Sequence, residues 1–154
     1  MGILNKPNFR GRSIHRLDAK GRLRIPTKFR EVLQNHYTDA LIIAQFGEEY
    51  LAAYPPEKWD EIESKAMRLS EVQPEHRSFL RRFVSSAEEC EFDNQGRILI
   101  PPMLRDEVGL DQEVVLAGVL SNFEIWDKAT WDVQAERDKQ NHHKIMETIA
   151  GAGL

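Results

Sequence analysis

Cysteine and long apolar stretches are both scarce in this chain of 154 residues. The one cysteine, Cys90, excludes an internal disulfide and fits a reducing, cytoplasmic compartment. No apolar run approaches the roughly 20 residues that span a bilayer, and polar residues interrupt the N-terminus where a secretory signal is apolar. Hydrophobic residues nevertheless make up 41% of the chain, which is normal for a globular protein. We therefore expect a globular domain with no membrane segment.

Charge is unevenly distributed along the chain. The formal net charge is -4, which taken alone argues against a nucleic-acid ligand. Residues 1–30, however, contain nine basic side chains and one acidic residue, Asp18. Polyanions respond to local patches more than to totals. Composition alone fits a solvated charged face as well as a nucleic-acid surface.

A short sequence motif occurs twice in the chain. Asp18–Pro26 reads DAKGRLRIP and Asp93–Pro101 reads DNQGRILIP, so both follow the pattern D-x-x-G-R, apolar, x, Ile, Pro. An internal repeat of this kind fixes the architecture. Because half of this chain can bury only a thin core, we expect the two halves to pack on each other or on other subunits.

The same order of elements is predicted in both halves. Period-two alternation around a glycine turn predicts a β-hairpin at each motif, and the proline after it suits the start of a short helix. In the first half we expect a hairpin at 14–25, a helix at 27–33, strands at 40–46 and 50–54, and a helix from 55 to about 69. In the second half we expect a hairpin at 92–101, a helix at 103–108, strands at 113–119 and 123–126, and a helix from 127 to about 148.

These elements predict an α+β fold with a mostly β core, flanking helices and a pseudo-two-fold axis. The helical pattern at 75–86 links the copies. Trp59 and Trp131 occupy equivalent places and are expected in the core. The expected division is a flexible leader at 1–8, a module at 9–58, a helical linker at 59–86, a second module at 87–131, and a C-terminal helix and tail at 132–154.

Both copies keep the aspartate and glycine of the motif. Gly21 and Gly96 are expected to supply a positive φ at the turn. Asp18 and Asp93 open the turn, where a short carboxylate can accept backbone N–H groups and orient the arginine four residues later.

The repeated arginines, Arg22 and Arg97, allow two interpretations. One is an ion pair with the aspartate of the same turn, which contributes only about 0–1 kcal/mol if exposed. The other is a planar donor fork at an outward-facing loop tip, suited to a phosphate or a guanine edge. The two roles can coexist.

The first copy is the more basic one. The second copy has Gln95, Leu99 and Met103 where the first has lysine or arginine, so the first is expected to dominate salt-dependent binding. The cations expected to contact nucleic acid are Arg22, Arg97, Lys20, Arg24, Arg16, Arg12 and Lys28.

Other chemistries find little support in the sequence. His143 and Glu147 share a helix face, but two ligands are few for a metal site. Cys90 lacks the partners of a catalytic thiol and is expected to be a partly buried structural thiol. No phosphate-binding glycine motif is present. We expect no enzyme activity, no cofactor, no metal and no small-molecule substrate.

The residues quoted above, with NFRG at 8–11, HRLDAKGRLRIP at 15–26 and FEIW at 123–126, resemble the MraZ family. The resemblance covers about Phe9 to Trp131. It implies two AbrB-like modules in a swapped-hairpin or double-psi type of barrel, with the family's D-x-x-x-R signature falling on Asp18 and Arg22 and on Asp93 and Arg97. Residues 1–7 precede the usual start of such proteins, and the tail after Trp131 is variable among them.

The resemblance also implies a function. It indicates a bacterial, nucleoid-associated repressor of the division and cell-wall gene cluster, its own operon. Ring-shaped homo-oligomers are expected to bind short direct repeats in promoter DNA, where several weak contacts act together. The alternative from another class is an oligomeric protein-interaction scaffold, whose basic face grips an acidic partner instead of DNA.

Overall fold

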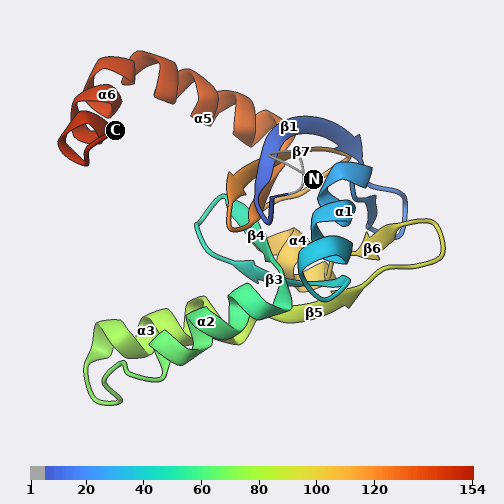
Figure 1. Cartoon of the computed structure of the whole chain (residues 1–154), viewed down its shortest axis with the longest axis horizontal. Helices are drawn as coiled ribbons and strands as arrows, with labels where there is room; N and C mark the ends of the chain where they lie inside the picture. Colours follow the sequence, from blue (N-terminus) through green and yellow to red (C-terminus); the bar gives the residue numbers. More distant parts are fainter. Residues whose placement is uncertain (1–5) are drawn as a thin grey trace.

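The protein is described here by a computed structural model covering residues 6–154. The flexible leader expected at residues 1–8 lies mostly outside these residues. Of its remaining part, the Pro7 carbonyl accepts a hydrogen bond from the Tyr37 hydroxyl at 2.8 Å. The fold is α+β, with a mostly antiparallel sheet and the internal duplication that the sequence predicts (Figure 1).

The two halves contain the same series of elements. The first half contains β1 (Phe9–Arg16), β2 (Arg22–Arg24), α1 (Thr27–His36), β3 (Ala40–Gln45), β4 (Tyr50–Tyr54) and α2 (Pro56–Ala66). Between the halves lie α3 (Pro74–Arg82) and the 3-10 turn η2 (Val84–Ser86). The second half contains β5 (Glu88–Glu91), β6 (Arg97–Leu99), α4 (Pro102–Glu107), β7 (Glu113–Leu120), β8 (Phe123–Asp127), α5 (Lys128–Gln140) and α6 (His142–Gly151).

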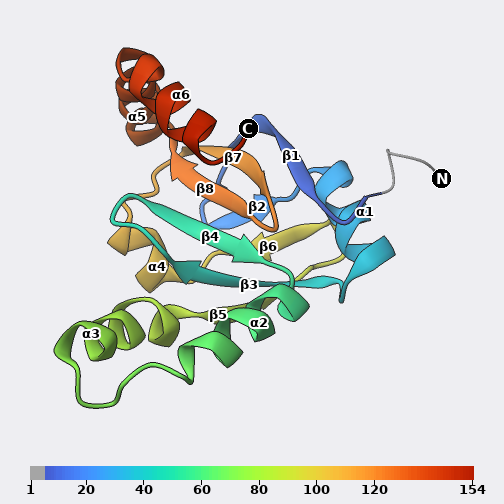
Figure 2. The same ribbon diagram turned by 60° about the vertical axis from the view of Figure 1, so that its left-hand side comes forward.

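The strands interleave the two halves around a pseudo-two-fold axis. Six strands form one sheet in the order β1-β7-β8-β4-β3-β5, and β2 pairs with β6 in a separate two-stranded ribbon. β1 and β5 hold equivalent places in the two halves, and each lies at an edge beside a strand of the other half (Figure 2). Each repeat thus contributes its edge strand to the part of the sheet that the other repeat forms.

The prediction that each motif forms a β-hairpin is wrong, because the strands before and after each turn do not pair with each other. Along its whole length β1 pairs with β7, and β5 pairs with β3. The chain does turn after each edge strand, but the strand beyond the turn pairs with its counterpart in the other half. Period-two alternation identifies a strand without identifying its partner. Gly118 favours the observed pairing, because a Cβ there would lie 2.5 Å from the Arg10 backbone nitrogen.

One apolar core joins both halves beneath the ribbon. Leu23 and Ile98, which face each other across the ribbon, are 0% and 1% exposed. Ile25 and Ile100 are also buried, as their repetition in the motif predicts. They pack in one cluster with sheet residues and with the side-chain rings of Phe9, Phe29 and Phe123.

Helix α2 and the segment after α3 cover a second, smaller core on the sheet. Trp59 and Phe83 pack on the outer side of β3 and β4, with ring centroids 5.4 Å apart. Trp131 is only half-buried, with its ring centroid 5.7 Å from that of Trp126, so the prediction of a core role holds for Trp59 alone.

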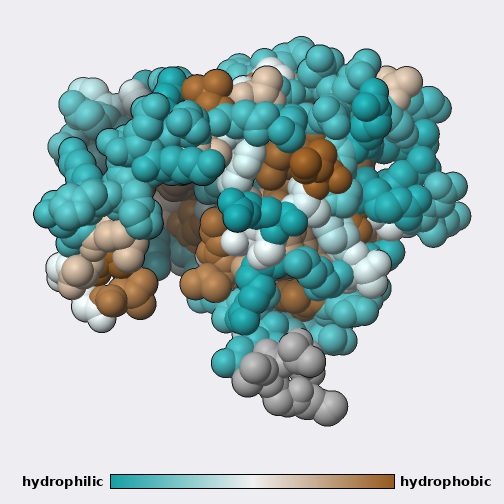
Figure 3. All heavy atoms as spheres, turned by 90° about the horizontal axis from the view of Figure 1, so that it is seen from above, coloured by the Kyte–Doolittle hydropathy of each residue, from teal (hydrophilic) through white to brown (hydrophobic). Residues whose placement is uncertain are grey.

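The single last helix predicted to reach about residue 148 is interrupted. Asn141 separates α5 from α6 and has φ -99° and ψ 13°. Its side-chain amide donates to the Arg137 carbonyl at 3.0 Å, a local bond that competes with helix propagation. Between residues 6 and 154, no helix combines the length and the apolarity required to cross a membrane. The face seen from above is largely hydrophilic, with apolar side chains in separate groups (Figure 3).

The ribbon should be essential to stability. We expect Leu23→Ala to lower the free energy of unfolding by about 2–5 kcal/mol, because it opens a cavity under the ribbon. Urea unfolding would measure the loss. Leu99→Ala, on the 50% exposed outer side of the same ribbon, is the matched control and should change it by about 0.5 kcal/mol or less. Equal losses in the two variants would contradict this account of the core.

Candidate nucleic-acid interface

The outer face of the β2–β6 ribbon brings both motifs together. Arg22 lies opposite Leu99, and Arg24 lies opposite Arg97. Because side chains alternate along a strand and Leu23 and Ile98 point into the core, these four project from the other face. Three of the four are arginines, so the ribbon presents a concentrated positive charge.

The first loop is a tight turn organised by Asp18. The carboxylate accepts the backbone N–H groups of Lys20 at 2.9 Å and Arg22 at 2.8 Å. The Gly21 N–H donates to the Asp18 carbonyl at 3.0 Å, and Gly21 has φ +84°, a conformation that favours glycine. The Nε of Arg22 then donates to Asp18 Oδ2 at 2.5 Å. One carboxylate thereby fixes both the loop and the arginine.

The second loop repeats this geometry. Asp93 accepts the N–H groups of Gln95 at 2.8 Å and Arg97 at 2.9 Å, and Gly96 has φ +74°. Arg97 Nε donates to Asp93 Oδ2 at 2.9 Å. The ion pairs considered from the sequence are therefore present in both copies.

Hydrogen bonding keeps both aspartates ionised. The backbone N–H of Arg22, then the Arg22 side chain and the Lys20 N–H, lower the pKa of Asp18 to about 2. The Arg97 N–H, followed by the Gln95 N–H and the Arg97 side chain, likewise lowers the pKa of Asp93. Each loop thus holds an anionic hydrogen-bond acceptor beside its arginine over the ordinary pH range.

Bonds between the halves lock the loops together. Arg97 Nη1 lies 3.7 Å from Asp18 Oδ2, so this carboxylate is shared between both motif arginines. Arg24 donates to the Gln95 carbonyl at 2.6 Å. The Ile25 N–H donates to the Gly96 carbonyl at 3.2 Å, and the Ile100 N–H donates to the Gly21 carbonyl at 3.0 Å. The site is consequently one unit made from two loops.

The motif arginines do not stand free at the loop tips, as the sequence led us to expect. They begin the ribbon strands, and their side chains are 34% and 21% exposed for Arg22 and Arg97. Their bonds to Asp18 and Asp93 account for this placement. What each presents outward is the part of the guanidinium that its aspartate does not bind.

The other predicted cations fall into two groups. Lys20 and Arg24 are exposed beside Arg22 on the ribbon and its loop. Arg16 is also exposed, just before the loop, and donates to Gln112 Oε1 at 2.6 Å. The remaining two are carried by other elements: Arg12 of β1 is 6.0 Å from the Trp131 ring centroid, and Lys28 of α1 is 5.8 Å from that of Phe29.

Two supporting arginines went unassigned in the sequence, although both repeats contain them. The guanidinium of Arg105 lies where a side chain at Gly21 would be, and its Nε donates to the Ile100 carbonyl at 3.2 Å. Arg30 pairs with Asp39 at 3.2 Å and stacks 4.4 Å from the Phe92 ring centroid. Their recurrence at equivalent positions was the signal that could have identified them.

The weaker sequence candidates show no assembled site. Within residues 6–154, no cluster of three potential metal ligands occurs. His143 and Glu147 contact each other at 3.3 Å on an exposed helix face. Cys90 is buried, and burial, followed by the nearby Glu88 and Glu89 charges, raises its thiol pKa to about 12. Such a thiol is inert as a nucleophile.

The fold and the twinned motif define a protein built by duplication of one α+β unit. A family model described as "MraZ protein, putative antitoxin-like" matches the chain twice, over residues 9–82 and 83–150. The chain therefore belongs to the MraZ family, a family of transcriptional regulators.

Curated relatives match over most of their length. A protein of Syntrophobacter fumaroxidans is 70% identical over 151 residues, which is 98% of this chain and 100% of the relative. Relatives from Shewanella denitrificans and Desulfosudis oleivorans are 43% and 40% identical, over 83% and 95% of this chain and 85% and 99% of their own. All three bear the name "Transcriptional regulator MraZ".

The Asp18 loop should make stability depend on pH in the acid range. Because the folded-state pKa of about 2 lies below the ordinary value of 3.8 for an aspartate, the ionised carboxylate stabilises the fold fully above about pH 4 and loses this effect as the pH falls toward 2. We expect the stability difference between wild type and Asp18→Asn to be constant above pH 4 and to shrink below it. Urea midpoints between about pH 2 and 7 would measure it. Asp60→Asn, on exposed α2, is the control, and a difference that persists unchanged to pH 2 would contradict the assignment.

Proposed function

We propose that this chain is a sequence-specific repressor that binds double-stranded promoter DNA through the β2–β6 ribbon. The observation that supports this most is the group of arginines from both motifs on one ribbon, with Arg22 and Arg97 held by Asp18 and Asp93. A two-stranded ribbon is narrow enough for the major groove, and a fixed guanidinium suits a guanine edge or a phosphate.

The two strands of the ribbon, with the loops that precede them, differ in what they offer DNA. Lys20 and Arg24, from the first repeat, are exposed and would contribute phosphate contacts beside Arg22. The corresponding second-repeat residues are Gln95 and Leu99. We infer that the first repeat dominates binding and that Arg97 makes the smaller contribution. Arg16, Arg12 and Lys28 would add contacts that position the protein without specifying sequence.

Opposite charges at the two edges of the sheet support self-association. Arg10, Arg12 and Arg16 are exposed on β1 at one edge, whereas Glu88, Glu89 and Glu91 are exposed on β5 at the other. Complementary edges on one chain favour head-to-tail contacts, which close into rings when the rotation permits. We propose a ring-like homo-oligomer that binds short direct repeats, since equivalent ribbons around a ring point in the same sense.

The biological setting is proposed from family membership. Together with the relatives named as transcriptional regulators, it favours a cytoplasmic, nucleoid-associated repressor of the division and cell-wall gene cluster, the chain's own operon. A footprint on the DNA upstream of the gene for this chain would test the direct repeats. A protected region without repeated sequence would overturn that part of the proposal.

Arg22 should be needed for DNA affinity. We expect Arg22→Ala to weaken binding by about 1–3 kcal/mol, because it removes a placed base or phosphate donor. Arg97→Ala should lose less. Fluorescence anisotropy with a duplex from the upstream region would measure both, and sedimentation would verify an unchanged oligomer.

Two control variants separate a DNA contact from a damaged loop. Asp18→Asn removes the ionic tie but retains the Arg22 cation, so it should weaken binding less than Arg22→Ala. Arg137→Ala removes a cation of α5, far along the chain from the ribbon, and should leave affinity unchanged. Unchanged affinity in Arg22→Ala would reject its role, and equal losses in Asp18→Asn and Arg22→Ala would assign the effect to loop structure.

The two repeats should contribute unequally to the salt dependence of binding. Each phosphate contact changes the slope of log K against log salt by about 1. We expect Lys20→Gln, which copies Gln95, to reduce the slope by about this amount, and Gln95→Lys to increase it. Titrations between about 50 and 200 mM salt would measure the slopes. A flat response in wild type would refute phosphate contacts at this loop.

A further inference from the structure

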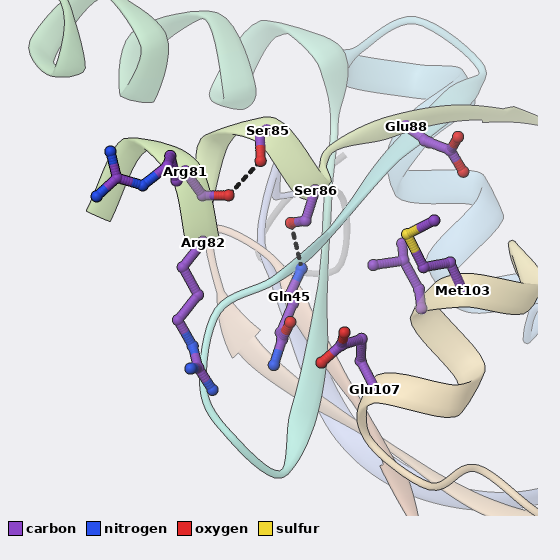
Figure 4. Close-up of a pocket in the computed structure, with 9 residues that line it drawn as sticks. Gln45, Arg81, Arg82, Ser85, Ser86, Glu88, Met103 and Glu107 are labelled. Atoms are coloured by element: carbon purple, nitrogen blue, oxygen red, sulfur yellow. Dashed lines mark hydrogen bonds between the residues drawn. The ribbon is translucent and has the colours of Figure 1, made fainter. Parts of the chain in front are cut away.

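A cavity lies where α3, η2, β3 and α4 meet, away from the ribbon's outer face. Its volume is about 480 Å³, within the range of roughly 300–1,000 Å³ typical of small-molecule sites. Gln45 forms its floor, Arg82 lies on one side, and Glu107 and Met103 lie on the other (Figure 4). The proposed DNA contacts use none of these residues.

The cavity lies where the two halves differ, at the end of β3 that its partner strand leaves uncovered. The pairing registers make Gly118 of β7 the counterpart of Gln45 in β3. β1 covers β7 as far as Phe9, and its backbone leaves no room for a side chain at Gly118. The shorter β5 begins at Glu88, opposite Ile43, so β3 extends beyond its partner at its end. Gln45 therefore projects its side chain at a position where, in the other repeat, the backbone of β1 occupies the space.

Gln45 carries unused hydrogen-bonding groups into the cavity. The residue is 5% exposed, and its backbone N–H donates to Ser86 Oγ at 2.9 Å. Among residues 6–154, none forms a hydrogen bond with its side-chain amide. The amide is open to the cavity, since among residues 6–154 every fully buried side-chain nitrogen or oxygen has a hydrogen-bond partner, and it is directed between Arg82 and Glu107 (Figure 4). The amide can donate and accept at once, as can a peptide group.

Charges of opposite sign line the two sides of this amide. Arg82 lies on one side and Glu107 on the other, and both are exposed. Within the described chain, neither forms a salt bridge with another residue. The thioether of Met103, which is 76% exposed, and the buried Leu104 add apolar surface on the Glu107 side. The arrangement matches a ligand with an anionic group, a central amide, an ammonium group and an apolar side chain.

We propose that this cavity binds a short zwitterionic peptide of two or three residues. Its carboxylate would pair with Arg82, a peptide group would form two hydrogen bonds with the Gln45 amide, and its amino group would pair with Glu107. An apolar side chain would contact Met103 and Leu104. The proposal does not require DNA binding, although α4 directly follows the β6 strand of the ribbon.

Calorimetric titration of the full chain with dipeptides tests the proposal. The probes are Ala-Leu, Leu-Ala and Gly-Phe with free termini, each titrated up to about 10 mM, where a millimolar Kd is measurable. We expect at least one to bind and the Gln45→Met, Arg82→Gln and Glu107→Gln variants to bind it at least tenfold more weakly. Glu136→Gln, on exposed α5, is the matched control and should bind like wild type. Thermal unfolding without ligand establishes that each variant is folded.

Blocked termini assign each charge separately. Acetylating the amino group of the bound dipeptide should weaken binding to wild type at least tenfold and cause little further loss in Glu107→Gln. Amidating its carboxylate should likewise weaken binding to wild type at least tenfold and cause little further loss in Arg82→Gln. Such coupling is what a direct contact produces in a double-mutant cycle. Additive losses would overturn the assignment of that contact.

Two results would reject the site. Absence of binding by all three dipeptides would overturn it. An altered oligomer size for Gln45→Met or Arg82→Gln in sedimentation, without dipeptide binding, would instead identify the cavity as an interface between copies of the chain. Because these readouts use no DNA, they remain informative whether or not the proposed promoter binding holds.

Discussion

Pairing of β2 with β6 is the constraint on which the rest of the molecule depends. Each strand has three residues, and an isolated two-stranded ribbon is marginal in water. Here Leu23 and Ile98 anchor the pair in the common core, and backbone bonds from each loop cross to the other half. The exchanged edge strands also hold the two halves together, since β1 pairs with β7 of the second half and β5 pairs with β3 of the first half. Neither half can therefore present its arginine without the other.

This constraint separates two kinds of cation at the surface. Arg22 and Arg97 are partly buried and tied to carboxylates, so their long side chains are already ordered in the folded chain, which would lower the entropic cost of the proposed contact with DNA. Lys20 and Arg24 are exposed beside them. Fixed groups provide geometry, whereas exposed groups provide long-range attraction that salt screens. The aspartates reduce the local positive charge, but they give the arginines one orientation.

The sequence predicts the parts of this fold better than their connections. The repeated D-x-x-G-R pattern predicted both turns and the buried Ile25 and Ile100, and it offered the ion pairs as one of two interpretations of the arginines, because turn chemistry and short-range hydrogen bonding are local. It did not identify the partner of β1 or β2, because alternation in one strand carries no information about another. The cavity at Gln45 could not be foreseen either, since it arises from the different lengths of β1 and β5.

Duplication gives this chain two equivalent frameworks whose surfaces differ. Arg24 faces Arg97 across the ribbon, but Leu99, the counterpart of Arg24, faces Arg22. One end of the ribbon is therefore doubly cationic and the other mixed, although their backbones are alike. At the sheet edges the same framework carries arginines on β1 and glutamates on β5. A symmetric fold with asymmetric surfaces thus distinguishes its two sheet edges and the two ends of its ribbon.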